Sequence, residues 1–496
     1  MPLLSPAHAL TLPELAAALQ SRDALTLPTE AVARMQACYD YLHHRLAAAP
    51  DQLLADINTG LNPPHNTVIQ QDEQAQLQVN LLMSHACGTG AEVPTALVRR
   101  MLLLKVQGLS YGHSGVAVAT AKRLLDYFNR DVWPVVYEHG GPAPLAHLCL
   151  PLLGLGEVSY QGYRLAASDV NSLFGWEPLP LQAHEAAALL GGTQFALAYA
   201  TEALERTQHL LNAADVIGAL STAAFGGHAQ PFAESLQRLR PHAGQALVAA
   251  RLHGLLAGSE LPAPSDRETE PDPYSFRCQP QVHGASRDAV AYVAQTIETE
   301  CNSVTDSLSI FPDEDLVLTG GNFHGQPLAL VLSHLSLAVA ELGSISERRT
   351  AQLVSGQRGL PAGLVAEPGL HAGLAMPHRT AAGLVSQNQQ LCTPASAVSF
   401  ADGGGPADYV SMAANAATQA RRVVDNAEQI LGIELLTAVQ ALDLRRAAET
   451  GATGRSPALE AVAAAFREVV TFVPRDRVLS PDLHRAARFV REYAWQ

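Results

Sequence analysis

Two short stretches of this 496-residue chain hold side chains that can move protons or bind charged groups. Glu138 and His139 are adjacent; a histidine titrates near neutral pH, and burial can raise the pKa of a glutamate towards that range. Tyr274 and Arg277 are three residues apart, which is one helical turn. All four could instead be structural, as loop residues and as neighbours on a helix surface. Residue type alone leaves both interpretations open.

The other side chains that often carry chemistry show no site pattern. Several histidines could come together in the fold, namely His85, His113, His139, His324 and His378. Their spacing in the sequence matches no metal-binding motif, so we predict no metal centre. The six cysteines form no CxxC pair, which argues against a zinc ribbon. Lys105 and Lys122 are the only lysines, and we predict that both are solvated on helices.

The composition predicts a folded and mainly helical protein. Hydrophobic residues make up 48% and charged residues 16%, which excludes a disordered chain. The formal net charge of −15 argues against nucleic-acid binding through a basic surface. We find neither a secretory signal nor a transmembrane span, so we expect a soluble cytoplasmic protein with reduced thiols.

Helical periodicity and loop composition divide the chain. We predict a helix from residues 26–30 to about 49, further helices from about 72 and after 94, and one that begins near 143. Long apolar runs predict helices at about 326–354 and 408–446, and Gly432 interrupts the second without ending it. Irregular connections are predicted at 51–70, 131–144 and 259–284, where Pro, Gly and Asn gather.

Four sequence blocks carry a family resemblance. They are residues 57–60 (INTG), 77–86 (LQVNLLMSHA), 272–281 (DPYSFRCQPQ) and 302–327. In type and order they resemble the aromatic amino-acid ammonia-lyase and aminomutase family, the histidine and phenylalanine ammonia-lyases. The resemblance implies an all-α fold with a long central helix bundle of the fumarase/aspartase type. It also implies a homotetramer whose sites mix residues from several subunits. We predict an N-terminal domain at 1–200 and a bundle with C-terminal helices at 201–496.

The family's electrophile has no matching residues here. The resemblance implies a methylidene-imidazolone (MIO) group, which an internal Ala-Ser-Gly forms by cyclisation and loss of water. Glu138, His139 and Gly140 stand at those positions, and no Ser or Thr lies between Lys122 and Val158. Without a β-hydroxyl no methylidene can form, so we predict that the chain carries no cofactor.

Other family positions have changed or been kept. Ala55 stands where the resemblance implies a catalytic tyrosine, and the remaining departures are Gly191, Pro271, Pro406 and Ala407. By resemblance, Arg277 holds the substrate carboxylate and Tyr274 lies near the electrophile; a planar guanidinium suits a carboxylate's two oxygens. The other predicted substrate-binding residues are His85, Asn58, Phe323 and Gln281.

From these residues we expect an MIO-independent enzyme of specialised metabolism on the lyase scaffold. It would perform acid/base chemistry on a carboxylate-bearing small molecule, by elimination, addition, isomerisation, cyclisation or condensation. Glu138, His139 and Tyr274 would be catalytic. The alternative is a catalytically inactive homologue that serves as a binding or scaffold subunit. A conventional ammonia-lyase is the third and least expected possibility.

Overall fold

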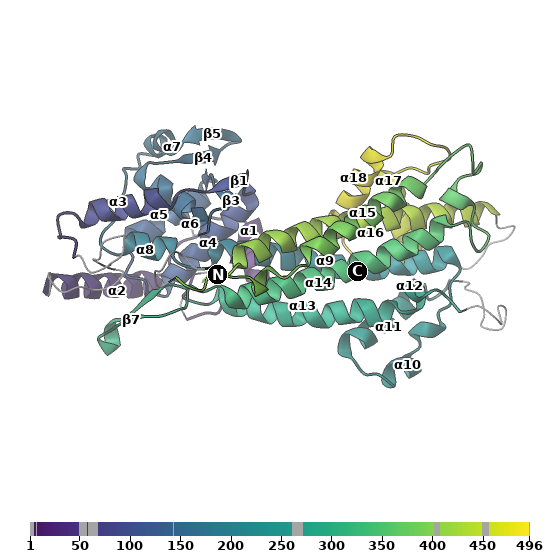
Figure 1. The fold of residues 1–496 in the computed structure, drawn as a ribbon, viewed down its shortest axis with the longest axis horizontal. Helices are drawn as coiled ribbons and strands as arrows, with labels where there is room; N and C mark the ends of the chain where they lie inside the picture. The colour runs from purple at the N-terminus through teal and green to yellow at the C-terminus, as the bar shows by residue number, and fades with distance from the viewer. Residues whose placement is uncertain are drawn as a thin grey trace. The chain divides into compact units, whose positions relative to one another are not determined.

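The computed structural model describes residues 4–5, 7–48, 57, 68–141, 143–259, 271–400, 407–448 and 456–495. Helices dominate these residues, and the strands are short (Figure 1). The predicted all-helical class is therefore confirmed. Asn58, Ala55 and Pro406, which the sequence singled out, lie outside the described residues.

The chain forms two compact units, each assembled from three stretches of sequence. Unit 1 comprises residues 1–202, 295–330 and 395–418. Unit 2 comprises residues 203–294, 331–394 and 419–496. The division into two domains at residue 200 remains a prediction.

Unit 1 combines short helices with three small antiparallel sheets, of strand order β1-β3, β2-β4-β5 and β6-β7. Its helices are α1 (Leu12–Gln20), α2 (Thr29–Ala48), α3 (Gln74–His85), α4 (Thr95–Ser110), α5 (Val118–Asn129), α6 (Ala143–Cys149), α7 (Ala167–Leu173) and α8 (Glu185–Leu190). Its strands are β1 (Thr89–Glu92), β2 (Trp133–Pro134), β3 (Tyr137–His139), β4 (Glu157–Tyr160), β5 (Tyr163–Ala166), β6 (Leu308–Phe311) and β7 (Leu316–Thr319).

Long helices make up much of the rest of the chain. Four of them contribute residues to both units, namely α9 (Gln194–Phe225), α13 (Gln279–Cys301), α14 (Gln326–Val354) and α16 (Ala413–Ala448). The other helices, all in unit 2, are α10 (Glu234–Arg238), α11 (Ala243–Leu256), α12 (Tyr274–Arg277), α15 (Ala375–Leu391), α17 (Pro457–Val469) and α18 (Ser480–Glu492).

The two predicted long helices are present. Helix α14 has the predicted bounds, and α16 begins at Ala413, five residues later than predicted. Gly432 lies inside α16, as expected. A Cβ at Gly432 would come within 2.8 Å of the Ala487 nitrogen, so glycine lets α18 approach α16 closely.

Two predicted connections contain regular structure. Helix α13 already begins at Gln279, inside the predicted 259–284 connection. Pro280 stands in the first turn of this helix, where its missing N–H is not needed. Strands β2 and β3 lie within the predicted irregular segment 131–144, and α6 begins at Ala143 as predicted.

Buried charges are a marked feature of unit 2. Arg349 and Glu434 are fully buried and joined by two hydrogen bonds, of 2.5 Å from Nε to Oε1 and 2.9 Å from Nη2 to Oε2. Asp215 accepts hydrogen bonds from His283 Nδ1 at 2.9 Å and Arg287 Nη2 at 2.6 Å. Burial alone would raise the pKa of Asp215, but His283 and Arg287 hold it below its ordinary value. The buried carboxylates of Glu434 and Asp215 thus each have a cationic partner.

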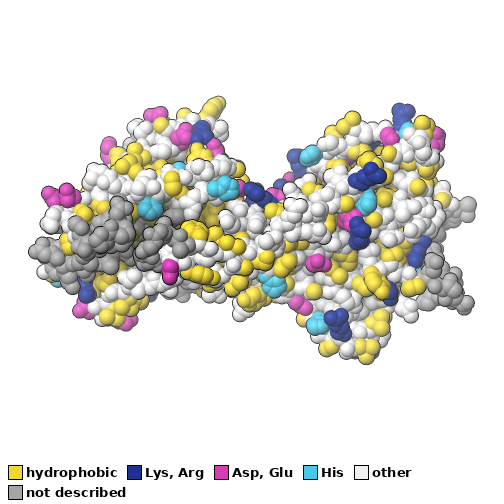
Figure 2. Space-filling model, viewed as in Figure 1, with side chains coloured by type: hydrophobic (Ala, Val, Ile, Leu, Met, Phe, Trp, Pro, Cys, Tyr) yellow, Lys and Arg dark blue, Asp and Glu magenta, His cyan; other side chains and the backbone are white. Residues whose placement is uncertain are grey.

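On the face drawn in Figure 2, Lys, Arg, Asp and Glu side chains stand singly or in small groups of both signs among hydrophobic and neutral atoms. By length and composition alone, α14 could cross a membrane. However, 61% of its most apolar window is buried inside the protein, as in the core helix of a soluble fold.

Candidate functional site

In unit 1, strand β3 carries Glu138 and His139. It pairs with β1, with Thr89 opposite His139 and Glu92 opposite Tyr137. Glu138 is half-buried, and its Oε1 accepts a hydrogen bond from the hydroxyl of buried Tyr199 at 3.1 Å. His139 is exposed. The strand therefore presents an imidazole to solvent and a carboxylate tied to a tyrosine.

Glycines let the loop after His85 approach this strand. Gly90 has a φ of +88°, and a Cβ there would lie only 2.5 Å from Cδ2 of His139. A Cβ at Gly140 would lie 3.0 Å from the Gly88 Cα. Any larger residue at these positions would push the loop and the strand apart. The fold thus places residues 88–90, which follow α3, beside His139 and Gly140.

His147 fixes the same loop from α6. Its Nε2 accepts a hydrogen bond from the Gly88 N–H at 3.0 Å, and its ring meets that of Tyr137 edge-on at 5.2 Å. Burial lowers the pKa of His147, which favours the neutral ring that can accept this bond. His147 is therefore a structural support of the Glu138 strand.

The prediction that Lys105 is solvated is wrong. The side chain is buried in unit 1, and its Nζ donates to the Ala188 and Gly191 carbonyl oxygens, each at 2.7 Å. These carbonyls lie at the C-terminal end of α8, where a cation is favourable. Burial lowers the pKa of Lys105, and nearby Asp306 opposes that shift. Lys122 is exposed, as predicted.

In unit 2, the single turn of α12 carries Tyr274 and Arg277. Tyr274 is 72% exposed, and the Arg277 guanidinium lies 4.6 Å from the centroid of its ring. Phe276, between them, is buried. Arg277 and Gln281 are half-buried, and among the described residues Arg277 Nε and Gln281 Oε1 have no hydrogen-bond partner. The turn thus holds its apolar residue inside and offers a cation–π pair outside.

The remaining predicted residues are spread through unit 1. His85 is half-buried at the end of α3, where its Nδ1 lies 2.9 Å from the Leu81 carbonyl oxygen. Phe323 is exposed in the segment before α14. Within unit 1 the structure brings the His85 loop close to Glu138 and His139. Tyr274 belongs to the other unit, so the predicted set as a single site remains a prediction.

Sequence reasoning missed two residues that support the Glu138 strand, Tyr199 and His147, and it misplaced Lys105. His147 ends the string Ala-Pro-Leu-Ala-His, which resembles the family in addition to the four blocks above, and that match could have singled it out. Lys105 stands in a run of apolar residues, MLLLKV, which was a sign of burial. Tyr199 gave no signal beyond its place in a helical pattern.

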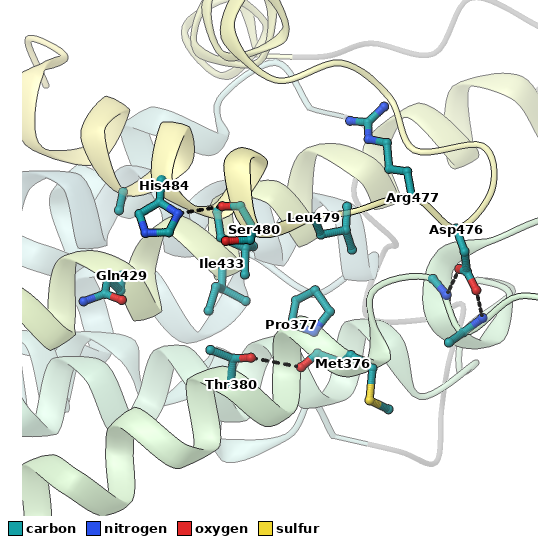
Figure 3. A pocket seen from close by; sticks show the side chains of 14 residues that line it. Met376, Pro377, Thr380, Gln429, Ile433, Asp476, Arg477, Leu479, Ser480 and His484 are labelled. Carbon is teal, nitrogen blue, oxygen red and sulfur yellow. Dashed lines mark hydrogen bonds between the residues drawn. The ribbon is translucent and has the colours of Figure 1, made fainter.

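A hollow of about 550 Å³ lies in unit 2 between α15, α16, α18 and the segment before α18 (Figure 3). None of the predicted site residues lines it. Two of its polar side chains already have partners: Asp476 accepts from the Ala372 and Gly373 N–H groups, and His484 Nδ1 bonds to the Ser480 carbonyl oxygen. We therefore assign it no part in the chemistry.

The chain is similar to several histidine ammonia-lyases over most of its length. A histidine ammonia-lyase from Symbiobacterium thermophilum is 44% identical over 441 residues, which cover 88% of this chain and 86% of that enzyme. One from Deinococcus radiodurans is 45% identical over 449 residues, covering 88% and 84%. The crystal structure of histidine ammonia-lyase from Trypanosoma cruzi is 36% identical, with a TM-score of 0.88 over 97% of this chain and 92% of that one. The predicted ammonia-lyase fold is confirmed.

These relatives correct three expectations. The prediction of an MIO-independent enzyme other than a conventional ammonia-lyase is wrong, because relatives at 44% and 45% identity are histidine ammonia-lyases. The alternative of an inactive scaffold subunit falls for the same reason. The prediction that no cofactor is used is also overturned, because the resemblance implies the MIO group for enzymes of this activity.

Residues 138–140 stand at the positions from which that group would form. They offer a carboxylate and an imidazole where its formation needs a serine hydroxyl, and residues 137–139 form a strand paired with β1. These three residues do not fit the group, so no step below is routed through it.

The family itself is settled by the extent of the match. The sequence model of the family described as "Aromatic amino acid lyase" matches residues 10–468, which is most of the chain. This range contains all the predicted site residues and both ends of the long helices. The chain belongs to the aromatic amino acid lyase family.

Proposed function

We propose that this chain is an ammonia-lyase acting on an amino acid with an imidazole side chain. The observation that carries the proposal is its 44% and 45% identity to histidine ammonia-lyases over 88% of its length. In the reaction the Cα–N bond breaks and its electron pair leaves with ammonia. A proton leaves the β carbon for a base, and the C–H pair forms the new C=C bond. The products are ammonia and an unsaturated imidazole acid.

Arg277 binds the substrate carboxylate in this proposal. A guanidinium can donate two parallel hydrogen bonds to a carboxylate, and the charge assists both. The exposed ring of Tyr274, 4.6 Å from the guanidinium, restricts the directions in which Arg277 can point. Tyr274 also offers a hydroxyl that can donate a hydrogen bond or a proton to the substrate.

Glu138 or His139 moves a proton during elimination. His139 is exposed on β3, so its ring is accessible to a substrate. The Glu138 carboxylate is held by the Tyr199 hydroxyl. Four further residues remain proposed contacts to the substrate: His85, Phe323, Gln281 and Asn58. We also propose the homotetramer that the resemblance implies and the cytoplasmic location expected from the sequence.

The test is an assay of the purified full-length chain with L-histidine. The conjugated product acid is followed by its near-ultraviolet absorbance, and ammonia is measured in a separate coupled assay. Equal amounts of both are expected, with slower turnover of phenylalanine and tyrosine. The intact mass of the same sample reports whether the backbone has lost water, as formation of the family's cofactor requires. Absence of ammonia from L-histidine would contradict the proposal, even if phenylalanine or tyrosine released it.

Variants test the proposed roles. Arg277→Gln removes a charged hydrogen-bond donor, so we expect about a tenfold or larger rise in the KM for histidine. Arg238→Gln is the matched control, because Arg238 is exposed and only loosely paired with Glu234 at 3.7 Å. Glu138→Gln or His139→Ala should lower kcat. Full activity in both would remove these residues from the proton transfer.

A further inference from the structure

Buried side chains of unit 2 support the α12 turn. Phe276 is buried and stacks on Phe225, with ring centroids 4.4 Å apart and ring planes at 9°. Asp272, two residues before Tyr274, is also buried. Its Oδ2 accepts a hydrogen bond from the His228 N–H at 2.7 Å. The two ends of the turn are therefore anchored by different interactions.

Arg358 contacts both anchors. Its Nη1 donates to Oδ1 of Asp272 at 2.7 Å. Its guanidinium carbon lies 4.5 Å from the centroid of the Phe225 ring, on which Phe276 stacks. The Arg358 guanidinium thus forms an ion pair with Asp272, which precedes the turn. It also contacts the ring of Phe225, which stacks on Phe276 inside the turn.

The backbone of Arg358 is held in an unusual conformation. Its φ is +52°, in the left-handed region that non-glycine residues rarely adopt. The surroundings impose this conformation: Arg445 Nη2 donates to the Arg358 carbonyl oxygen at 3.1 Å, and Arg358 Nη1 also donates to the Gly226 carbonyl oxygen at 3.2 Å. A residue kept in such a conformation by several contacts is a marker of a constrained functional region.

We propose that Arg358 is a positioning residue, which orients the Tyr274–Arg277 turn and through it the guanidinium that binds the substrate carboxylate. The inference rests on the proposed function and deepens it. Arg358 itself contacts no substrate. It acts by fixing Asp272 and the stacked Phe225–Phe276 pair, so that the Arg277 side chain starts from a defined backbone.

The first measurement needs no ligand. The amides of Phe276, Arg277 and Cys278 donate to the Pro273, Pro273 and Tyr274 carbonyl oxygens at 3.0, 3.1 and 2.9 Å. Arg358→Lys keeps the charge but loses the flat stacking surface. Hydrogen exchange of these three amides should become about tenfold faster or more, while exchange in β3 of unit 1 is unchanged. Unchanged exchange at the three amides would overturn the proposal.

The second measurement is a double-mutant cycle on the KM for histidine. Arg358→Lys alone should raise the KM about fivefold or more, with a smaller change in kcat, and Arg238→Lys should change neither. In an Arg277→Gln background, Arg358→Lys should have no further effect on the KM, because it acts through Arg277. Additive effects of the two substitutions would overturn this role.

A second variant keeps the proposal testable if the Arg358→Lys protein does not fold. Phe225→Leu removes the aromatic link while leaving the Arg358–Asp272 ion pair, and we expect faster exchange at the same amides. If the parent protein, without any substitution, releases no ammonia from histidine, the proposed function fails. Hydrogen exchange at the α12 amides then decides alone whether Arg358 positions the turn.

Discussion

The two segments with predicted catalytic residues are supported in different ways. In unit 1, the Glu138 strand is held by a short β-ladder, by glycines that allow close approach, and by neutral donors such as Tyr199. In unit 2, the α12 turn is held by buried charges and stacked rings. The close backbone contacts in unit 1 are sensitive to the size of an added side chain. The ion pairs in unit 2 are sensitive to the loss of a charge. The two segments should therefore respond to different substitutions.

The largest effect is expected in unit 2. Arg349→Met leaves the buried carboxylate of Glu434 without its cation, so the free energy of unfolding should fall by about 3–5 kcal/mol. Urea unfolding followed by circular dichroism measures the loss. The double variant Arg349→Met/Glu434→Gln should recover part of it, because no charge then stays buried alone. A loss below about 1 kcal/mol in the single variant would show that this charge pair does not support the bundle.

The next effect distinguishes the two lysines of unit 1. Lys105→Met keeps the apolar stem but leaves the Ala188 and Gly191 carbonyls without their donor, so we expect a loss of about 2–3 kcal/mol. Lys122→Met, at an exposed position, is the matched control and should change stability by no more than about 0.5 kcal/mol. Equal effects of the two substitutions would mean that the buried ammonium contributes nothing.

A smaller effect tests the backbone fit of unit 1. Gly90→Ala adds a methyl group against the His139 ring and should cost about 2 kcal/mol. Gly141→Ala meets no atom within 4 Å, although its φ is also positive, so only the backbone cost of about 1 kcal/mol is expected. Thermal unfolding of both variants measures the difference. Identical midpoints would show that the loop and the strand do not constrain each other.

Periodicity and family motifs predicted much of the fold. The bounds of α14 and the start of α6 followed from apolar spacing and from proline and glycine positions. Lys105 was misplaced because residue type suggested solvent, whereas α4 is buried on most of its faces. The start of α13 was missed because Pro280 can serve either a loop or a first helical turn.

The candidate site was less predictable than the fold. The motif match singled out Arg277 and Tyr274, but it could not supply the left-handed backbone of Arg358 or its stacking on Phe225. These depend on contacts between residues more than 80 positions apart. The missing Ala-Ser-Gly triplet led to a prediction of altered chemistry, which whole-chain similarity to histidine ammonia-lyases overturned. A local departure carried less information about function than the rest of the sequence.

The smallest effect concerns pH and His147. Burial lowers the pKa of this histidine from 6.5, so the folded protein favours the neutral ring that accepts the Gly88 N–H. Its contribution to stability is complete above pH 6.5 and is lost as the pH falls towards the lowered folded value. His147→Gln keeps an acceptor for Gly88 but does not titrate. The variant should therefore lose less stability than the parent between pH 7 and pH 5, as measured by urea unfolding at both pH values. If the two proteins lose equal stability, the ring of His147 does not couple protonation to the support of the Glu138 strand, and the pH response of unit 1 comes from other groups.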